Sequence, residues 1–327
     1  MHMNKTYNDK TINKLNAYVK KWLPECTSKF FKANIGIKSP STLYEYAVDL
    51  ADFFKYLESN SFDVNKMTIS DLDMITPEII ENYMEYSREY CVNNEVKTRS
   101  NEALRRRLCA ISSFFEYYSR YEIISRNPAA KIKPPSVKKE VEIPSTDKTE
   151  NDIVGFIFNG SLDGRRRAFQ KRTGIRDAAI VAVFASSGIK VSDLVNLNIE
   201  DVHLDELYIT LNRRKRHKKV YISTSAAQIL GQYLSQRLGI IADHDHDTAL
   251  FLSLRCKRMC IRSVQYMIKK YSNAVLGNGE HLTPEAIHRS FRNKIFIQSG
   301  NNIPMTSEIC GISQATLYQY YGPYLND

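Results

Sequence analysis

The chain of 327 residues contains 43% hydrophobic and 25% charged residues, which is typical of a globular protein large enough for two domains. Lys and Arg outnumber Asp and Glu by 46 to 36, giving a formal net charge of +10 that favours an anionic partner. No apolar run approaches the roughly 18 residues of a membrane span, and the polar start MHMNKTYNDK does not look like a signal peptide. The six cysteines form no CxxC pair, which argues against a disulfide framework or a zinc ribbon and favours the reducing cytoplasm.

The first third of the chain shows helical spacing and no strand alternation. Helix starts are marked by Ser39 before Pro40, by Thr76 before Pro77, and by Ser100, because such side chains cap the free N–H groups of a first turn. Apolar residues follow at three- and four-residue spacing, so the aromatic stripes are explained more simply as core than as base-stacking platforms. The stripes comprise Leu43, Tyr46, Phe53, Phe54, Ile80, Tyr83, Leu108, Phe114, Phe115 and Tyr118.

The helix after Ser100 carries three consecutive arginines, Arg105, Arg106 and Arg107. At about 100° per residue, we expect them to turn largely away from the apolar side. A solvated basic face and a rail for nucleic-acid phosphates both remain open as explanations.

Residues 126–148, RNPAAKIKPPSVKKEVEIPSTDK, hold four prolines and five lysines. Because the residue before a proline is pushed out of the helical region, this stretch is predicted to be an extended basic linker. Lys131 and Lys133 are candidate phosphate contacts within it. We therefore divide the chain into a helical domain of residues 1–125, the linker, and a second domain of residues 149–327.

The second domain is organised around residues 174–223. This stretch predicts an apolar helix, a tight turn at Gly188, a short helix opening at Ser192, and two strands at 207–211 and 220–222. The strands are joined by seven basic residues, whose mutual repulsion an anionic surface such as nucleic-acid phosphate would relieve; a solvated turn is the alternative. The block consists of Arg213, Arg214, Lys215, Arg216, His217, Lys218 and Lys219.

The flanks of this stretch are predicted to be helical with polar connections. A short helix at 151–158 leads into a polar loop containing residues 165–167, and further helices are expected at 226–236 and around Val264. The loop ADHDHD at 242–247 alternates His and Asp, but it lacks a second cluster to complete a tetrahedral set. We therefore expect no metal there.

Thr283 and Pro284 predict the start of another helix. Ile287, Phe291 and Ile295 share its expected buried side, and the opposite side gathers a polar face. That face comprises Glu285, His288, Arg289 and Arg292. Beyond it the chain ends in a helical segment and a tyrosine-dense tail.

The order of these parts resembles the tyrosine recombinases, also called phage-integrase-type recombinases, and among them the Xer branch. The resemblance spans nearly the whole chain, and many pieces in the family's order carry it together. They are STLYEYAVDLADFF at 41–54, the stretch at 174–204, the basic hairpin, DTALFLSL at 247–254, LTPEAIHRSF at 282–291 and GISQATLYQYY at 311–321.

The resemblance implies a mainly α fold, with an N-terminal helical core-binding domain of SAM-like type and a C-terminal catalytic-type domain containing a small antiparallel β-sheet. It implies double-stranded DNA as partner and a homo-oligomer, a tetramer on two DNA sites. In this family a tyrosine hydroxyl attacks a DNA phosphodiester and forms a 3′-phosphotyrosyl link. Positioned cations stabilise the transition state without a metal or other cofactor.

Carried over position by position, the family's catalytic set departs from its usual residues. The first arginine falls on Lys190, which keeps the charge but loses the planar fork of a guanidinium. The hairpin lysine falls on Arg214, with Lys215 beside it. The second arginine falls on His288, which Arg289 follows.

Two further positions lose a donor. The family's histidine falls on Glu285, which is also explained as an acid near a helix start. A later histidine or tryptophan falls on Ile312, which donates nothing. For the nucleophile the local pattern favours Tyr318, with Tyr320 and Tyr321 as competitors.

Losing one preorganised donor costs on the order of 10² to 10³ in rate. Strand cleavage is therefore expected to be impaired, or to be run by a rearranged set such as Lys190, Lys215, Arg289 and Arg292. Two functions follow: a recombinase acting in site-specific DNA recombination or integration, and a catalytically inactive DNA-binding accessory or regulatory protein. A basic RNA-binding or structural protein with a superficial likeness is the remaining alternative.

Overall fold

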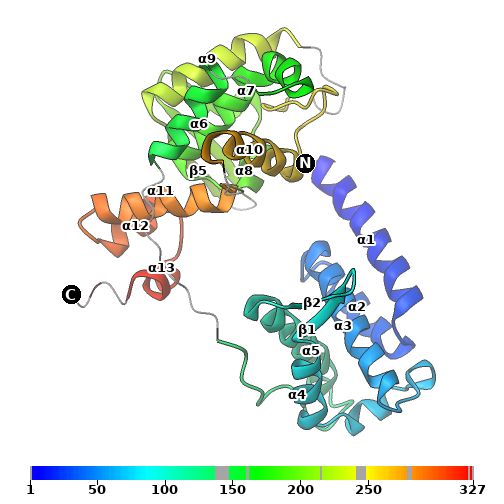
Figure 1. The fold of residues 1–327 in the computed structure, drawn as a ribbon. Coiled ribbons are helices and arrows are strands. Elements are labelled where there is room, and N and C mark those ends of the chain that lie inside the picture. Colours follow the sequence, from blue (N-terminus) through cyan, green and yellow to red (C-terminus); the bar gives the residue numbers. More distant parts are fainter. Residues whose placement is uncertain are drawn as a thin grey trace. The chain divides into compact units, whose positions relative to one another are not determined.

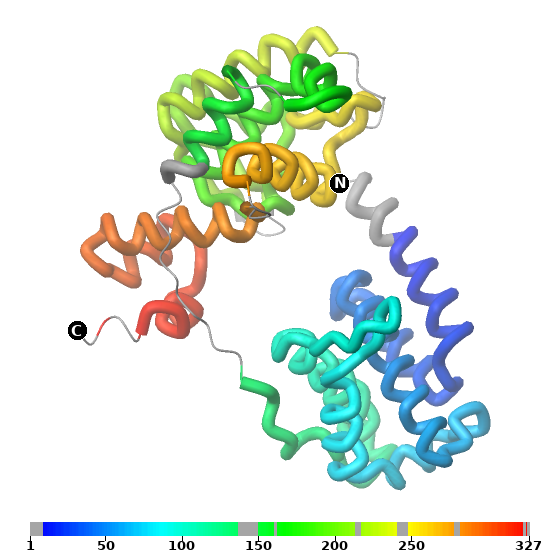
Figure 2. Tube along the Cα trace, viewed as in Figure 1, coloured from blue at the N-terminus to red at the C-terminus, as the bar shows by residue number. Residues whose placement is uncertain are grey.

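The computed structural model describes residues 2–136, 147–159, 162–213, 216–240, 248–277 and 282–322, together with Leu325. The chain forms two compact units, Met1–Lys138 and Lys139–Asp327. They run from blue to green and from green to red in Figure 2. None of the described helices is long and apolar enough to cross a membrane.

The first unit is a helical bundle (Figure 1). Ser39, Thr76 and Ser100 each accept a hydrogen bond from the backbone N–H three residues on, so the predicted caps are confirmed. The elements are α1 (His2–Trp22), η1 (Glu25–Thr27), α2 (Ser28–Asn34), α3 (Pro40–Ser59), η2 (Val64–Lys66), η3 (Ser70–Met74), α4 (Pro77–Tyr86) and α5 (Asn101–Arg120). Both α1 and α5 pack on α3.

The core of the first unit is rich in aromatic rings. Phe53, Phe54, Phe114, Phe115 and Tyr118 are all buried. Phe114 meets the edge of Phe54 at 5.9 Å and of Phe115 at 5.2 Å between ring centroids. The expectation that the aromatic stripes form the core is therefore confirmed.

The expectation that all three arginines of α5 turn away from the core is wrong. Arg107 is buried and its guanidinium pairs with Asp52 of α3. Arg106 pairs with Asp49 of the same helix, so of the three only Arg105 is exposed. The reason is that α3 presents carboxylates to α5, and charges in a helix interface need partners of opposite sign.

The first unit also contains a β-hairpin, contrary to the expectation of an all-helical domain. β1 (Glu89–Val92) and β2 (Glu95–Thr98) pair antiparallel. Between them Asn93 and Asn94 have φ angles of 52° and 63°, as a type I′ turn requires. Both strands are largely exposed, so no buried face imposes an alternating pattern on their sequence.

The beginning of the predicted linker packs on the first unit. The Asn127 side chain donates to the backbone of α5 at 3.2 Å, and Ala129 is buried in the core. Lys131 and Lys133 are exposed beyond this anchor. Residues 137–146 of the predicted linker lie outside the described residues.

The second unit is built around α7, whose residues from Ala178 to Phe184 are all buried. Its helices are α6 (Asp147–Asn159), α7 (Arg165–Ser187), α8 (Val191–Asn196), α9 (Thr224–Leu238), α10 (Ile261–Leu276), α11 (Pro284–Gln298), α12 (Ile303–Cys310) and α13 (Gln314–Tyr321), with the short η4 (Ile199–Asp201). Both α6 and α9 pack on α7 (Figure 1). Its antiparallel sheet has the order β3 (Val202–His203), β4 (Tyr208–Arg213), β5 (Arg216–Tyr221), which confirms the mainly α fold with a small sheet.

Three details of this unit differ from expectation. Residues 165–167, expected in a polar loop, open α7. Strands β4 and β5 continue into the basic block, with Arg213 opposite Arg216, so much of that block is strand rather than loop. Strand β3 was not predicted, because two residues are too few to show a pattern.

Several predicted residues lie outside the described part of the chain. Arg214 and Lys215 do, as do the side chains of Arg213 and Arg216 and the His/Asp loop at 242–247. Among the residues that the structure describes, no three His, Cys, Asp or Glu side chains gather as a metal site would need.

Candidate functional site

The turn after α7 forms one edge of the candidate site. Gly188 ends α7 with φ 56°, a left-handed conformation that side chains with a Cβ rarely adopt. A Cβ at this position would also lie 2.1 Å from the Phe291 ring of α11. The turn therefore requires glycine, and α11 docks directly on it. Two residues further on, Lys190 occupies the N-cap of α8 with an exposed side chain.

His288 of α11 faces the same turn. Its Nδ1 donates to the carbonyl oxygen of Gly188, because a carbonyl can only accept. Burial lowers the pKa of His288, whereas the Gly188 hydrogen bond and the Glu285 carboxylate oppose that shift. Lys190 and Arg292 lower the pKa further, so both cations lie near the imidazole. The ring is therefore neutral at pH 7, and its Nε2 is an acceptor rather than part of a second cation.

The polar face predicted on α11 is divided in the structure. His288 and Arg292 are buried, whereas Glu285 and Arg289 are exposed. Of the residues expected on its buried side, Ile287 is buried, whereas Phe291 and Ile295 are only partly covered. The reason is that α12 packs against α11 as well, so the helix has two covered sides. Arg289, a candidate catalytic residue, consequently points away from the His288 side.

Arg292 reaches across to Tyr321 of α13. Its Nε donates to the Tyr321 hydroxyl at 3.0 Å, and that hydroxyl donates to Asn293 Oδ1 at 2.5 Å. The guanidinium lies 4.2 Å from the ring centroid of Tyr320 and 5.7 Å from that of Tyr321, both within cation–π range. The Tyr321 ring stacks on Phe296 at 4.0 Å. Burial raises the pKa of Tyr321, and the Arg292 charge opposes this.

The tyrosines of the tail differ sharply in exposure. Tyr318, favoured in the sequence analysis, is 51% exposed, whereas Tyr321 is 1% exposed. The structure thus brings Tyr321 into the α11 cluster and leaves Tyr318 outside it. The sequence signal for this was the four-residue spacing of Leu317 and Tyr321, which places both on the inner side of α13.

The basic hairpin contributes Lys218 to the same end of the unit. Its Nζ donates to the carbonyl oxygens of Glu308 at 3.3 Å and Ile309 at 3.0 Å. These groups lie at the C-terminus of α12, where the helix dipole favours a cation. Lys218, predicted to bind DNA, therefore fastens β5 to α12. Lys219 is exposed, with its Nζ 4.3 Å from the ring centroid of Tyr208.

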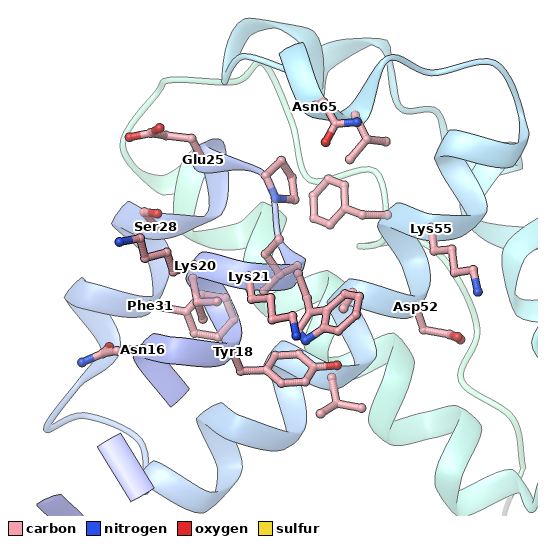
Figure 3. A pocket seen from close by; sticks show the side chains of 18 of the residues that line it. Asn16, Tyr18, Lys20, Lys21, Glu25, Ser28, Phe31, Asp52, Lys55 and Asn65 are labelled. Carbon is pink, nitrogen blue, oxygen red and sulfur yellow. The ribbon is translucent and has the colours of Figure 1, made fainter. Parts of the chain in front are cut away.

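A cavity of about 1140 Å³ lies in the first unit among α1, α2 and α3 (Figure 3). Lys20, Lys21 and Lys55 line it together with Asp52, so it carries charges of both signs. Its lining contains neither a histidine nor a cysteine. Because basic and acidic side chains line it together, we describe it as a mixed-charge hollow.

A second cavity of about 770 Å³ lies between α7 and α10 in the second unit. Arg166, Arg255 and Arg262 line it, together with Tyr266, which is 67% exposed. The sequence analysis did not select these residues. The sequence signal for Arg255 and Arg262 was the basic run RCKRMCIR at 255–262. Cations beside an exposed aromatic ring suit an anionic polymer that carries groups able to stack on the ring.

The region that contains His288, Arg292 and Tyr321 matches a known family. Residues 166–322 match the model described as "Phage integrase family". This part of the chain therefore belongs to the phage integrase, or tyrosine recombinase, family. The predicted family is thereby confirmed, and the candidate site lies within the matched residues.

Relatives with Xer names extend the likeness over most of the chain. "Tyrosine recombinase XerC" of Caldanaerobacter subterraneus subsp. tengcongensis is 26% identical over 298 residues, 88% of this chain and 79% of the relative. "Tyrosine recombinase XerS" of Lactococcus lactis subsp. cremoris is 24% identical over 335 residues, 93% of each. The Tn1549 transposon integrase, solved with a circular intermediate DNA, aligns with a TM-score of 0.67 at 14% identity over 91% of this chain and 93% of that chain, which shows a common fold.

Proposed function

We propose that the protein is a DNA-binding tyrosine recombinase that cleaves and rejoins strands at specific DNA sites through a 3′-phosphotyrosyl intermediate. The family match and relatives named tyrosine recombinase support this, as does a structural neighbour solved with DNA. The single observation that carries the proposal is the Tyr321 hydroxyl held by Arg292, in a cluster that includes His288 and Lys190. A hydroxyl nucleophile beside cations suits attack on an anionic phosphodiester.

In this proposal Tyr321 takes the nucleophilic role for which the sequence favours Tyr318. The Tyr321 oxygen bonds to phosphorus as the bond from phosphorus to the 5′ oxygen breaks. The phenol proton is released to solvent, and the 5′ oxygen takes a proton from the hairpin, where Arg214 and Lys215 remain the candidates. The reverse attack by a 5′ hydroxyl rejoins the strand and frees the tyrosine.

We expect this cleavage to be slow. Lys190 offers a point charge where a guanidinium fork would grip two phosphate oxygens. His288 is neutral, and Ile312 packs against the ring cluster of Phe296 and Tyr321 without a donor. Each missing donor costs on the order of 10² to 10³ in rate, and such losses are not additive within one site.

The proposed DNA interface consists of exposed cations. In the first unit these are Arg105, Lys131 and Lys133, and in the second unit they are Lys219, Arg166, Arg255 and Arg262. Such contacts hold the phosphate backbone and raise affinity for any duplex. We leave Arg106, Arg107 and Lys218 out of the interface, since their charges are engaged within the protein.

A second candidate function is that of a DNA-binding accessory protein without cleavage. The observation that favours it is the burial of Tyr321, whose hydroxyl both accepts and donates a hydrogen bond inside the protein. A hydroxyl satisfied in this way reaches a phosphate only if its hydrogen bond to Asn293 breaks and the side chains that cover it open; cleavage requires this opening with the Arg292 bond kept. This candidate retains every proposed phosphate contact.

The two functions are separated by trapping the covalent intermediate. Duplexes that the protein selects from a random pool would be nicked near their centres, so that a cleaved fragment diffuses away and religation is prevented. We expect a protein–DNA adduct that survives denaturation and that Tyr321→Phe abolishes. Tight duplex binding without adduct at any nick position would leave the accessory function standing.

A further inference from the structure

Arg292 is a buried charge without an acidic partner in the part of the chain that the structure describes. It is 5% exposed, and its guanidinium contacts there a phenol oxygen and two aromatic faces. A buried cation without a counter-charge is unfavourable. Cation–π contacts offset only a part of that cost. The arrangement is therefore suited to an anion that arrives from outside.

The position of Arg292 on α11 allows it to supply the positive charge that the neutral His288 lacks. It follows His288 by four residues, so the two side chains leave the helix on the same side, with Cβ atoms roughly 5 to 6 Å apart. His288 is neutral because it is buried and donates to Gly188. A cation one helical turn further along, on a longer side chain, can restore the missing charge. Arg289 cannot, because it is exposed on another side.

We propose that Arg292 is a positioning residue that compensates for His288: it aims the Tyr321 oxygen at the DNA phosphorus and stabilises the negative charge which that oxygen gains. This inference rests on the proposed function and concerns the same step. A hydrogen bond donated to an oxygen favours its ionised form, and the Nε–H of Arg292 makes that bond at 3.0 Å.

The neighbours of Arg292 fit this role. The Tyr320 ring lies 4.2 Å from the guanidinium and limits its rotation. Asn293 accepts the Tyr321 proton in a hydrogen bond, but an amide oxygen does not take up a proton at neutral pH, so Asn293 orients the hydroxyl and is not its base. The proton therefore leaves to solvent, and the rate of cleavage should rise with pH until the phenol is ionised.

The test is the rate of adduct formation on nicked duplex from neutral to alkaline pH, for the full chain and for Arg292→Gln, Arg292→Lys and Arg289→Gln. We expect Arg292→Gln to slow cleavage on the order of 10²-fold and to move the rising limb of the pH profile to higher pH. Arg292→Lys keeps the charge without the planar donor and should recover part of the rate. Arg289→Gln, which removes the exposed neighbouring cation, should slow cleavage far less than Arg292→Gln does.

Thermal unfolding and duplex affinity serve as controls for folding, and Arg292→Lys keeps the test open if Arg292→Gln does not fold. An unchanged pH profile in both Arg292 variants would overturn the inference, as would loss of activity in Arg289→Gln but not in Arg292→Gln. In either case an adduct formed by the unmodified chain would leave the proposed function intact. Absence of any adduct from the unmodified chain would instead overturn the proposed function.

Discussion

Asp49 is a carboxylate enclosed within the first unit. Its side chain is 1% exposed and lies between Arg106 and Arg107. Burial raises the pKa of Asp49 to about 6, although both arginines pull it down. Because the ordinary value is 3.8, the folded protein binds the proton more tightly than the unfolded chain does. The resulting stabilisation is complete below pH 3.8 and is lost as the pH rises through about 6.

This titration predicts a pH-dependent difference between the protein and Asp49→Asn. As the pH rises from about 4 to about 6, the unmodified chain should lose stability relative to the variant, on the order of 3 kcal/mol. Urea unfolding followed by circular dichroism at several pH values measures this difference. A difference that stays constant across the window would show that the carboxylate does not titrate there.

The direction in which single side chains point was the feature hardest to predict from the sequence. The sequence gives no sign that Arg107 turns inward, because its partner Asp52 lies more than fifty positions away. The same holds for Tyr321, whose role depends on Arg292 of another helix. Both contacts join separate elements, and helical periodicity within one element cannot report them.

At the scale of elements, the helix starts were predictable and the sheet was less so. A cap such as Ser39 bonds the N–H of Thr42 only three residues on, so its signal is local. The β1–β2 hairpin carried a local signal too, Asn93 and Asn94, but its exposed strands offered no alternation. In α11 two sides are covered, so the apolar pattern alone could not show that His288 faces inward.

The α7–α8 turn is predicted to tolerate no side chain. Gly188→Ala combines a positive φ with a clash against Phe291, and should lower the free energy of unfolding by roughly 2 to 4 kcal/mol. Gly300→Ala is the control, because Gly300 also has a positive φ, 66°, but no atom within 4 Å of the point where a Cβ would lie; backbone strain alone costs about 1 to 2 kcal/mol. Equal losses for both variants in denaturant unfolding would contradict the close docking of α11.

The contact between β5 and α12 predicts a stability effect of Lys218. Lys218→Met removes an ammonium from the last carbonyls of α12 and should lower the free energy of unfolding by about 0.5 to 1.5 kcal/mol. Lys219→Met, next along the strand but exposed, should change it by less than about 0.5 kcal/mol. If thermal melting ranks these two variants the other way round, Lys218 does not hold β5 to α12.

At the scale of the whole molecule, the formal net charge of +10 predicts duplex binding that weakens steeply with salt. Replacing Lys131 and Lys133 together by Gln should lower the slope of log K against log salt by about 2, since each lost phosphate contact removes about 0.9. Lys218→Met should change the slope less, because its ammonium is hydrogen-bonded to carbonyl oxygens of α12. Fluorescence anisotropy over a salt series decides between these outcomes, and a slope that responds only to Lys218 would place the interface elsewhere.

The central claim is that Tyr321, held by Arg292, joins to DNA. The most direct measurement is digestion of the trapped protein–DNA adduct followed by mass spectrometry of the peptide that carries the nucleotide. We predict that the modified residue is Tyr321 and that Tyr318→Phe still forms the adduct. A modified Tyr318, or an adduct that persists in Tyr321→Phe, would contradict the account.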